Sequence, residues 1–174
     1  MPLRTPLDAT PEEVKALLLP VRHDFSVALH ALGNPFAAGA IIRAAHNFLA
    51  REIILIGSAP FYEKAAMGME KYETVRRVDD DDAFFRLVAG RPVWAVEKDL
   101  ASRSLYDDGP FPADLVFVFG SERAGLDAAF VGRCAETVGI PIYGVNNSLP
   151  VALAAGIVMS EWARRRYAGG RMVR

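Results

Sequence analysis

Three short stretches of this 174-residue chain combine glycine with polar or charged side chains, as binding loops do. Residues 33–39 read Gly-Asn-Pro-Phe-Ala-Ala-Gly and are followed by Arg43. Residues 119–126 read Phe-Gly-Ser-Glu-Arg-Ala-Gly-Leu, and residues 140–149 pass from an apolar segment into a polar loop. Such loops offer free backbone N–H and C=O groups, and a helix that begins after one adds unsatisfied donors. These stretches therefore predict a ligand site built largely from backbone.

Composition and charge narrow the classes of protein to consider. Hydrophobic residues make up 52% of the chain and charged residues 24%, which is typical of a globular domain. We find no apolar run of about 18 residues and no apolar signal core near Met1, so we expect a cytoplasmic protein without a membrane partner. Cys134 is the only cysteine, which excludes an internal disulfide and a cysteine-cluster zinc site. The net charge of −1 means that a polyanion would need a local basic patch.

The elements that must position these loops alternate between strand and helix patterns. This order predicts an α/β fold with a mainly parallel sheet and helices on both faces. We expect strands at 25–32, 53–57, within 71–78, at 92–96, 114–119 and 138–142. We expect helices at 9–19, 37–50, 61–69, 79–89, 127–133 and 149–166, and a polar connection at 97–113 with room for a short helix.

Two helix starts carry clear signals. Thr10, Pro11 and Glu13 form a capping-box pattern, and this first helix precedes the first strand, so residues 1–20 are expected to form a helical appendage. The four aspartates at 79–82 complement the dipole of the helix that they open, so we interpret them as capping residues and expect no metal site. Ligands of parallel sheets bind beyond the carboxyl ends of the strands, where the three loops are expected to meet.

Taken together, the three loops resemble the motifs of the SpoU family, the 2′-O-ribose RNA methyltransferases of the SPOUT superfamily. The first motif matches through Asn34-Pro35, Gly39 and Arg43. The second matches as residues 119–126, and the third as residues 140–144 followed by Ser-Leu at 148–149. The order and spacing of all three motifs agree with the family, and the resemblance covers about residues 23–167.

The resemblance implies S-adenosylmethionine as cofactor, RNA as substrate and a homodimer with a composite active site. It also implies a methyltransferase domain over residues 21–168 whose C-terminal part forms a trefoil knot. Gly169-Gly170 indicate that residues 169–174 form a flexible basic tail. Because few residues lie outside the motif region, tRNA is favoured over rRNA. The cofactor residues implied, mainly through backbone groups, are Phe119, Gly120, Ile140, Ile142, Ser148 and Leu149.

The resemblance also assigns catalytic roles to Arg43, Glu122 and Ser148. A guanidinium with a pKa above about 12 is a poor general base, so Arg43 is expected to hold a substrate phosphate. Glu122 either pairs with Arg43 or a partner-chain arginine, or caps the following helix. Ser148 serves the cofactor, the substrate or only a helix cap. The RNA-binding candidates are Asn34, Arg43, His46 and Arg123, and further basic residues that phosphate contacts would suit are Lys71, Arg76, Arg77, Arg103 and the cluster 164–166.

Two departures from the family pattern leave a second reading open. Ala37 stands where the first motif usually has Asn, and Pro150 stands where the third motif usually continues Ser-Leu with Asn. Asn34, Asn146 or Asn147 are candidates to replace the lost amides. The alternative to an enzyme is therefore a non-catalytic RNA- or S-adenosylmethionine-binding member of the same fold. A third class, an unrelated nucleotide-binding protein, lacks support because neither G-x-G-x-x-G nor G-x-x-x-x-G-K-[ST] occurs in these loops.

Overall fold

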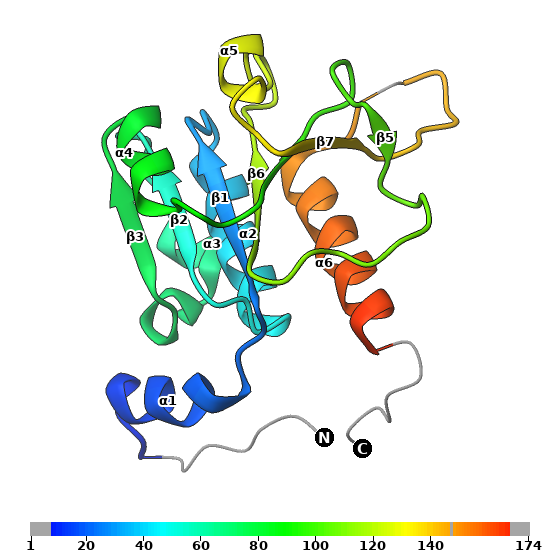
Figure 1. Cartoon of the computed structure of the whole chain (residues 1–174). Helices are drawn as coiled ribbons and strands as arrows, with labels where there is room; N and C mark the ends of the chain where they lie inside the picture. The colour runs from blue at the N-terminus through cyan, green and yellow to red at the C-terminus, as the bar shows by residue number, and fades with distance from the viewer. Residues whose placement is uncertain (1–7, 147, 168–174) are drawn as a thin grey trace.

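The computed structural model describes residues 8–146 and 148–167, which form a parallel sheet covered by helices (Figure 1). The sheet order is β3-β2-β1-β6-β4-β7-β5, and every pairing between these strands is parallel. The strands are β1 (Phe25–His30), β2 (Ile53–Ile56), β3 (Val75–Val78), β4 (Val93–Val96), β5 (Arg103–Ser104), β6 (Leu115–Phe119) and β7 (Glu136–Gly139). The helices are α1 (Pro11–Leu18), α2 (Pro35–Asn47), α3 (Glu63–Ala66), α4 (Asp81–Leu87), α5 (Ala128–Val131) and α6 (Val151–Tyr167), with short 3-10 helices η1 (Leu19–Val21) and η2 (Met69–Tyr72).

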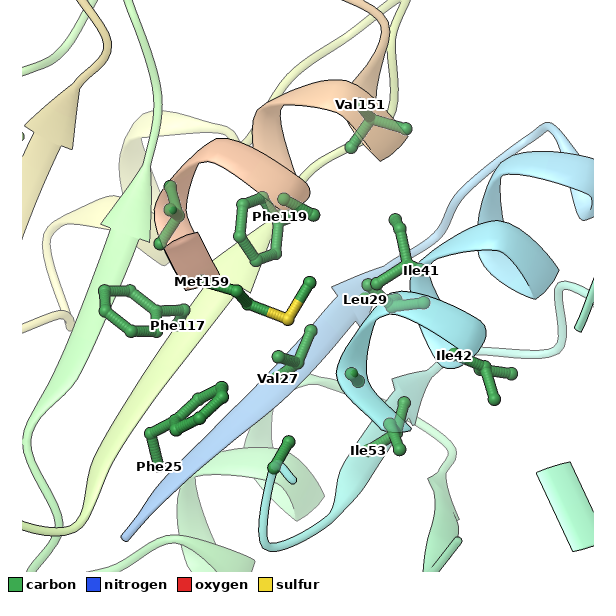
Figure 2. Packing of buried hydrophobic residues seen from close by; sticks show 14 of the residues in the cluster. Phe25, Val27, Leu29, Ile41, Ile42, Ile53, Phe117, Phe119, Val151 and Met159 are labelled. Atoms are coloured by element: carbon green, nitrogen blue, oxygen red, sulfur yellow. The ribbon is translucent and has the colours of Figure 1, made fainter. Parts of the chain in front are cut away.

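The two faces of the sheet bury separate apolar clusters. Alternate residues of β1 point to opposite faces, so Val27 and Leu29 pack with α2 and α6, as Figure 2 shows around Ile41 and Met159. Ala28 belongs to the other cluster, which α4 and α5 cover through residues such as Phe84 and Phe130. Burial on both faces explains why β1, β2 and β6 are continuously apolar. The expected α/β class and the helices on both faces are confirmed.

The predicted helix caps are present. The Thr10 hydroxyl oxygen accepts a hydrogen bond from the Glu13 backbone N–H, and the Glu13 carboxylate accepts one from the Thr10 backbone N–H. The Asp80 carboxylate accepts from the Ala83 backbone N–H, so the aspartate run caps α4 as predicted. Helix α1 lies beneath the sheet in Figure 1 and contacts η2, burying Val14 and Leu18.

Several predicted boundaries were wrong, and the reasons are local. The last strand covers 136–139 rather than 138–142, because Pro141 lacks the N–H that a ladder needs, and residues 140–142 lie past the strand. Within 97–113 the chain forms the edge strand β5 beside β7 instead of a short helix. Helix α6 begins at Val151 rather than at residue 149.

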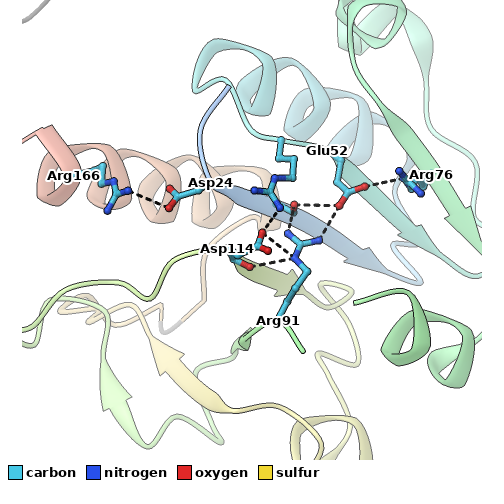
Figure 3. A network of polar contacts seen from close by, with 8 residues as sticks. Asp24, Glu52, Arg76, Arg91, Asp114 and Arg166 are labelled. Carbon is cyan, nitrogen blue, oxygen red and sulfur yellow. Dashed lines mark hydrogen bonds and ion pairs between the residues drawn. The ribbon is translucent and has the colours of Figure 1, made fainter. Parts of the chain in front are cut away.

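The amino edge of the sheet is held by an ion-pair network (Figure 3). Glu52 is 8% exposed and pairs with Arg91 at 2.8 Å and with Arg76 at 2.9 Å. Arg91 also donates to the hydroxyl of buried Ser26 at 2.6 Å. Asp114 accepts from Arg91 at 3.1 Å. These residues lie before or at the starts of parallel strands, so Arg76 has a partner at this edge of the sheet, away from the predicted binding loops.

In the part of the chain that the structure describes, no helix is both long and apolar enough to cross a membrane. The expected basic tail at 169–174 and the start of the N-terminal segment, residues 1–7, lie outside the described residues, as does Asn147.

Candidate functional site

A cavity of about 300 Å³ lies at the carboxyl edge of the sheet, between the loop after β6 and the segment that joins β7 to α6. All six residues predicted to bind the cofactor line it, namely Phe119, Gly120, Ile140, Ile142, Ser148 and Leu149. Glu122 and Arg123 line the same cavity. Residues from the second and third sequence motifs, about 20 positions apart, are thus brought together where ligands of parallel sheets bind.

Two glycines give the loop at 120–126 its shape. A side chain on Gly120 would place its Cβ 2.4 Å from the backbone carbonyl carbon of Gly125, so the backbones of the two glycines are in direct contact. Gly125 has φ +65°, in the left-handed region that glycine enters at little cost. The Gly125 N–H donates to the Ser121 carbonyl at 2.8 Å, and the Ala124 N–H donates to the Ser121 hydroxyl at 3.2 Å. The loop is therefore closed on itself and presents backbone to the cavity.

A third wall of the cavity comes from the segment that follows β4, which the motif comparison missed. Glu97 lines the cavity, and its carboxylate accepts a hydrogen bond from the Leu126 backbone N–H at 3.0 Å. The neighbouring Lys98 and Asp99 also line the cavity. One signal was available in the sequence: these residues follow a predicted strand directly, so the rule that placed the other loops at the carboxyl edge applies to them as well.

Two described residues of the segment before α6, Asn146 and Ser148, are hydrogen-bonded to each other. Asn146 accepts hydrogen bonds through its side-chain oxygen from the Ser148 N–H at 3.3 Å and from the Ser148 hydroxyl at 3.0 Å. The Pro150 carbonyl accepts from the N–H groups of Leu153 and Ala154. Because the helix begins at Val151, Ser148 lies ahead of its first turn, so the structure does not support the helix cap among the three roles considered for Ser148. Pro150 stands before the helix, where its missing N–H breaks no helical hydrogen bond.

The residues of the first motif lie outside this cavity. Arg43 is exposed on α2, and no described residue forms a hydrogen bond or ion pair with its guanidinium. Asn34 caps α2, since its side-chain oxygen accepts from the backbone N–H groups of Phe36 and Ala37. That oxygen is thus engaged in the cap, while Ala37 is buried in the first turn of the helix. Within one chain the structure does not bring Arg43 to the cofactor residues.

His46 has a partner inside the protein. Its Nδ1 lies 2.8 Å from a carboxylate oxygen of Glu73, which is 2% exposed. Arg22 binds the same carboxylate at 2.6 Å and also donates to the carbonyl oxygens of Ala50 and Tyr72. His46 is therefore part of a network that joins α2 to the segment before β3, as expected for a lone histidine with a structural role. Its contact with RNA stays a prediction.

Glu122 does not cap the following helix. Asp127 does so, because its carboxylate accepts from the Phe130 N–H at 2.8 Å. Glu122 is exposed at the cavity, and it makes no ion pair or hydrogen bond with any residue that the structure describes, Arg43 included. Its carboxylate is thus available to a ligand or to a second chain.

The arginines at the end of α6 are tied into the fold. Arg164 and Arg165 both bind the Glu161 carboxylate at 2.7 Å, and Arg165 also donates to the carbonyl oxygen of Gly109. The hydrogen bond from Arg164, with a further one from Arg165, lowers the pKa of Glu161 to about 2. Arg166 pairs with Asp24 at 3.1 Å. All three arginines thus have partners within the fold, and their contact with phosphate stays a prediction.

The model of the SpoU rRNA Methylase family matches residues 24–160, which is most of the chain. The chain belongs to the SpoU rRNA methylase family. All three walls of the cavity lie within the matched region, and the resemblance seen in the three motifs is confirmed.

Curated relatives in this family are RNA methyltransferases. The 23S rRNA (guanosine-2′-O-)-methyltransferase RlmB of Coxiella burnetii is 30% identical over 145 residues, covering 80% of this chain and 58% of RlmB. A putative TrmH family tRNA/rRNA methyltransferase, YacO of Bacillus subtilis, is 29% identical, covering 82% of this chain and 59% of YacO. The chain thus spans less than two thirds of the length of either relative.

Solved structures of the family share the fold. The SpoU methyltransferase AviRb of Streptomyces viridochromogenes, solved with AdoMet, superposes with a TM-score of 0.77 at 27% identity, over 97% of this chain and 65% of AviRb. A structure solved to explain 2-OH methylation of C/U34 on tRNA has a TM-score of 0.77 at 26% identity, over 84% of this chain and 98% of that one.

Among the described residues no group of three or more His, Cys, Asp or Glu side chains is placed to hold a metal.

Proposed function

We propose that this SpoU-family chain transfers a methyl group from S-adenosylmethionine to a ribose 2′-hydroxyl of RNA. The observation that carries the proposal is the cavity at the carboxyl edge, which the second and third motifs line together. RlmB methylates a guanosine 2′-oxygen in 23S rRNA, and AviRb binds AdoMet, which supports both the reaction and the cofactor.

The residues around the cavity suit this cofactor. Its volume of about 300 Å³ is at the lower end of the usual range for small-molecule sites. Ile140, Ile142 and Leu149 supply apolar surface for a purine, while the backbone of the loop at 120–126 supplies polar groups close to the ligand. The carboxylate of Glu122, which is exposed at the cavity, faces a cofactor that carries positive charge. When bound, S-adenosylmethionine supplies an electrophilic methyl group.

The protein's contribution to the reaction is alignment. Methyl transfer needs the 2′-oxygen in line with the methyl group, and holding both reactants in that geometry supplies several kcal/mol, roughly 7–11 at most. We assign Arg43 to the RNA phosphate through charge-assisted hydrogen bonds, with Arg123 at the cavity as a second contact. Ser148 is assigned to the cofactor or to the reacting ribose. Glu122 either holds the Arg43 guanidinium or takes the hydroxyl proton, and Glu122→Gln separates these roles, because Gln retains hydrogen bonding but is a far weaker proton acceptor.

Arg43 lies outside the cavity of its own chain, so we propose that a second copy supplies it to a composite site. We also propose that the segment joining β7 to α6 forms the trefoil knot that the resemblance implies. We also propose a cytoplasmic location, which an RNA substrate favours. We favour tRNA as the RNA substrate, with support from the neighbour whose solved structure concerns 2-OH methylation of C/U34 on tRNA.

Mixed dimers test the composite site directly. Arg43→Ala should abolish methyl transfer and leave cofactor affinity nearly unchanged, while Gly120→Ala should close the cavity, since its Cβ would overlap Gly125. A dimer of one chain of each kind keeps one complete site, so mixing the two inactive proteins is expected to restore activity. Absence of recovery in verified mixed dimers would contradict the composite site, and full activity of Arg43→Ala would contradict the role of Arg43.

The non-catalytic reading has specific observations behind it. Ala37 is buried where the family usually has Asn, and the Asn34 oxygen is already engaged in the helix cap. We propose catalysis because Pro150 leaves the first turn of α6 intact and the cavity keeps its other residues. The deciding experiment incubates the protein with labelled S-adenosylmethionine and unmodified tRNA or rRNA and maps alkali-resistant linkages. Binding of S-adenosylmethionine or RNA without methylated product would favour the non-catalytic alternative. Absence of both binding and product would exclude the enzyme and the non-catalytic binding protein alike.

A further inference from the structure

Glu97 lies where the three walls of the cavity meet. It follows β4 directly, and its backbone N–H donates to the Val138 carbonyl of β7 at 3.1 Å. Its side chain reaches the loop after β6, where one carboxylate oxygen accepts from the Leu126 N–H at 3.0 Å. The other oxygen accepts from the Lys98 N–H at 2.9 Å, which fixes the side chain in this orientation. One residue thus connects the ends of two strands with the loop of the second motif.

The packing beneath the loop depends on the same carboxylate. A Cβ on Gly125 would lie 2.4 Å from the Glu97 Oε2 atom, so the loop backbone rests directly on the carboxylate. On its other side Gly125 is in backbone contact with Gly120, which lines the cavity. Contact therefore runs without a gap from Glu97 through Gly125 to Gly120. A shift of the Glu97 side chain changes the support of the backbone that we assign to the cofactor.

We propose that Glu97 is a positioning residue that sets the cofactor-binding shape of the loop at 120–126. The inference rests on the proposed function, because it concerns the same cavity. Glu97 acts here through the loop and not through its charge. Asp99 provides the comparison, since it lines the same cavity and carries the same charge but pairs only with Lys98, at 3.7 Å, among the described residues.

The first measurement is hydrogen exchange at the Leu126 amide in the protein without cofactor. Glu97→Ala removes its acceptor and should raise the exchange rate at least about tenfold, the usual consequence of losing a hydrogen bond to a charged group. Glu97→Gln keeps an acceptor oxygen and should hold the rate within about threefold of the wild type. Asp99→Asn should leave it unchanged. Unchanged exchange in Glu97→Ala would overturn the inference, and this readout does not depend on any cofactor.

The second measurement compares binding of S-adenosylmethionine with that of S-adenosylhomocysteine, which lacks the positive charge on sulfur. Loss of loop shape should weaken both ligands by at least about tenfold in Glu97→Ala, with recovery in Glu97→Gln and no change in Asp99→Asn. A loss confined to S-adenosylmethionine, shared by Asp99→Asn, would mean that charge acts instead and would overturn the inference. Near-ultraviolet circular dichroism verifies that each variant is folded. Failure of the wild type to bind either ligand would instead contradict the proposed function.

Discussion

Gly39 lies where helix α2 meets α3 through backbone contact. A Cβ at this position would fall 2.4 Å from the Tyr62 carbonyl oxygen and 2.9 Å from the Ala65 Cβ. Gly39 lies one turn before Arg43 on α2, and the structure buries it against the neighbouring segment. Its small size therefore fixes how closely α2, and with it Arg43, approaches the rest of the domain.

We expect Gly39→Ala to destabilise the protein by about 1–3 kcal/mol, because the clash is with backbone, which cannot move aside as a flexible side chain would. Urea unfolding monitored by circular dichroism measures the change. Gly33→Ala is the matched control, since a Cβ there would meet nothing within 4 Å and the backbone is not in the left-handed region. Equal stability of the two variants would contradict the close contact.

At the scale of elements, α6 is held to the loop at 105–109 through one ion cluster. Arg165 binds Glu161 and the Gly109 carbonyl oxygen, so the Glu161 carboxylate orients the arginine that ties the helix to the loop. Arg164 and Arg165 keep the pKa of Glu161 near 2, below its ordinary value of 4.5. A depressed pKa means that this carboxylate stabilises the fold above about pH 4.5, and that the stabilisation is lost as the pH falls toward 2.

Glu161→Gln should therefore lower the free energy of unfolding at pH 7 by roughly 1.5–3 kcal/mol, the value of a hydrogen bond to a charged group, and lower the melting temperature with it. It should also flatten the decline in stability between pH 4.5 and pH 2 that the wild type shows. Thermal scans across this window measure both effects. Glu12→Gln, an exposed carboxyl on α1, is the control and should keep the wild-type profile. Identical acid profiles for the wild type and Glu161→Gln would contradict the role of the cluster.

At the scale of the whole molecule, activity is expected to depend on association, because Arg43 lies outside the cavity of its own chain. Leu153 on α6 is 52% exposed, and its neighbours Ala152, Ala154 and Gly156 are small enough for another backbone to approach. The resemblance implies a homodimer, and an exposed leucine flanked by small residues suits such a contact. We therefore expect the exposed side of α6 to carry the contact between two copies.

Leu153→Glu should raise the dimer dissociation constant at least about tenfold, because it places a charge where the dimer interface is expected to bury a leucine. Light scattering coupled to size-exclusion chromatography measures the mass across concentrations. Leu17→Glu on α1 is matched in exposure, also 52%, and should leave association unchanged. A wild-type protein that stays monomeric, or a Leu153→Glu protein that dimerises as well as the wild type, would contradict this interface.

The sequence by itself determined most of the elements and two of the three segments that form the cavity. Alternating apolar segments predicted the parallel sheet, and the motifs predicted Gly120, Ile142 and Ser148 as neighbours. Such features depend on local pattern, because hydrophobic period, caps and turn residues act within a few positions of the chain. Reliance on local pattern also caused the error at the last strand. The apolar run continues through Ile140, but the strand ends at Gly139, before Pro141, which cannot donate a hydrogen bond to the sheet.

Only the tertiary structure decided which side chains meet. Glu97 reaches an amide 29 positions away, His46 a carboxylate 27 positions away, and Arg22 that same carboxylate across 51 positions. No local pattern carries such information, because these contacts arise from how parallel strands are ordered in the sheet. The physical reason is the same for Arg43: its helix could be predicted, but its separation from the cavity follows from the packing of α2 and α6 on the sheet.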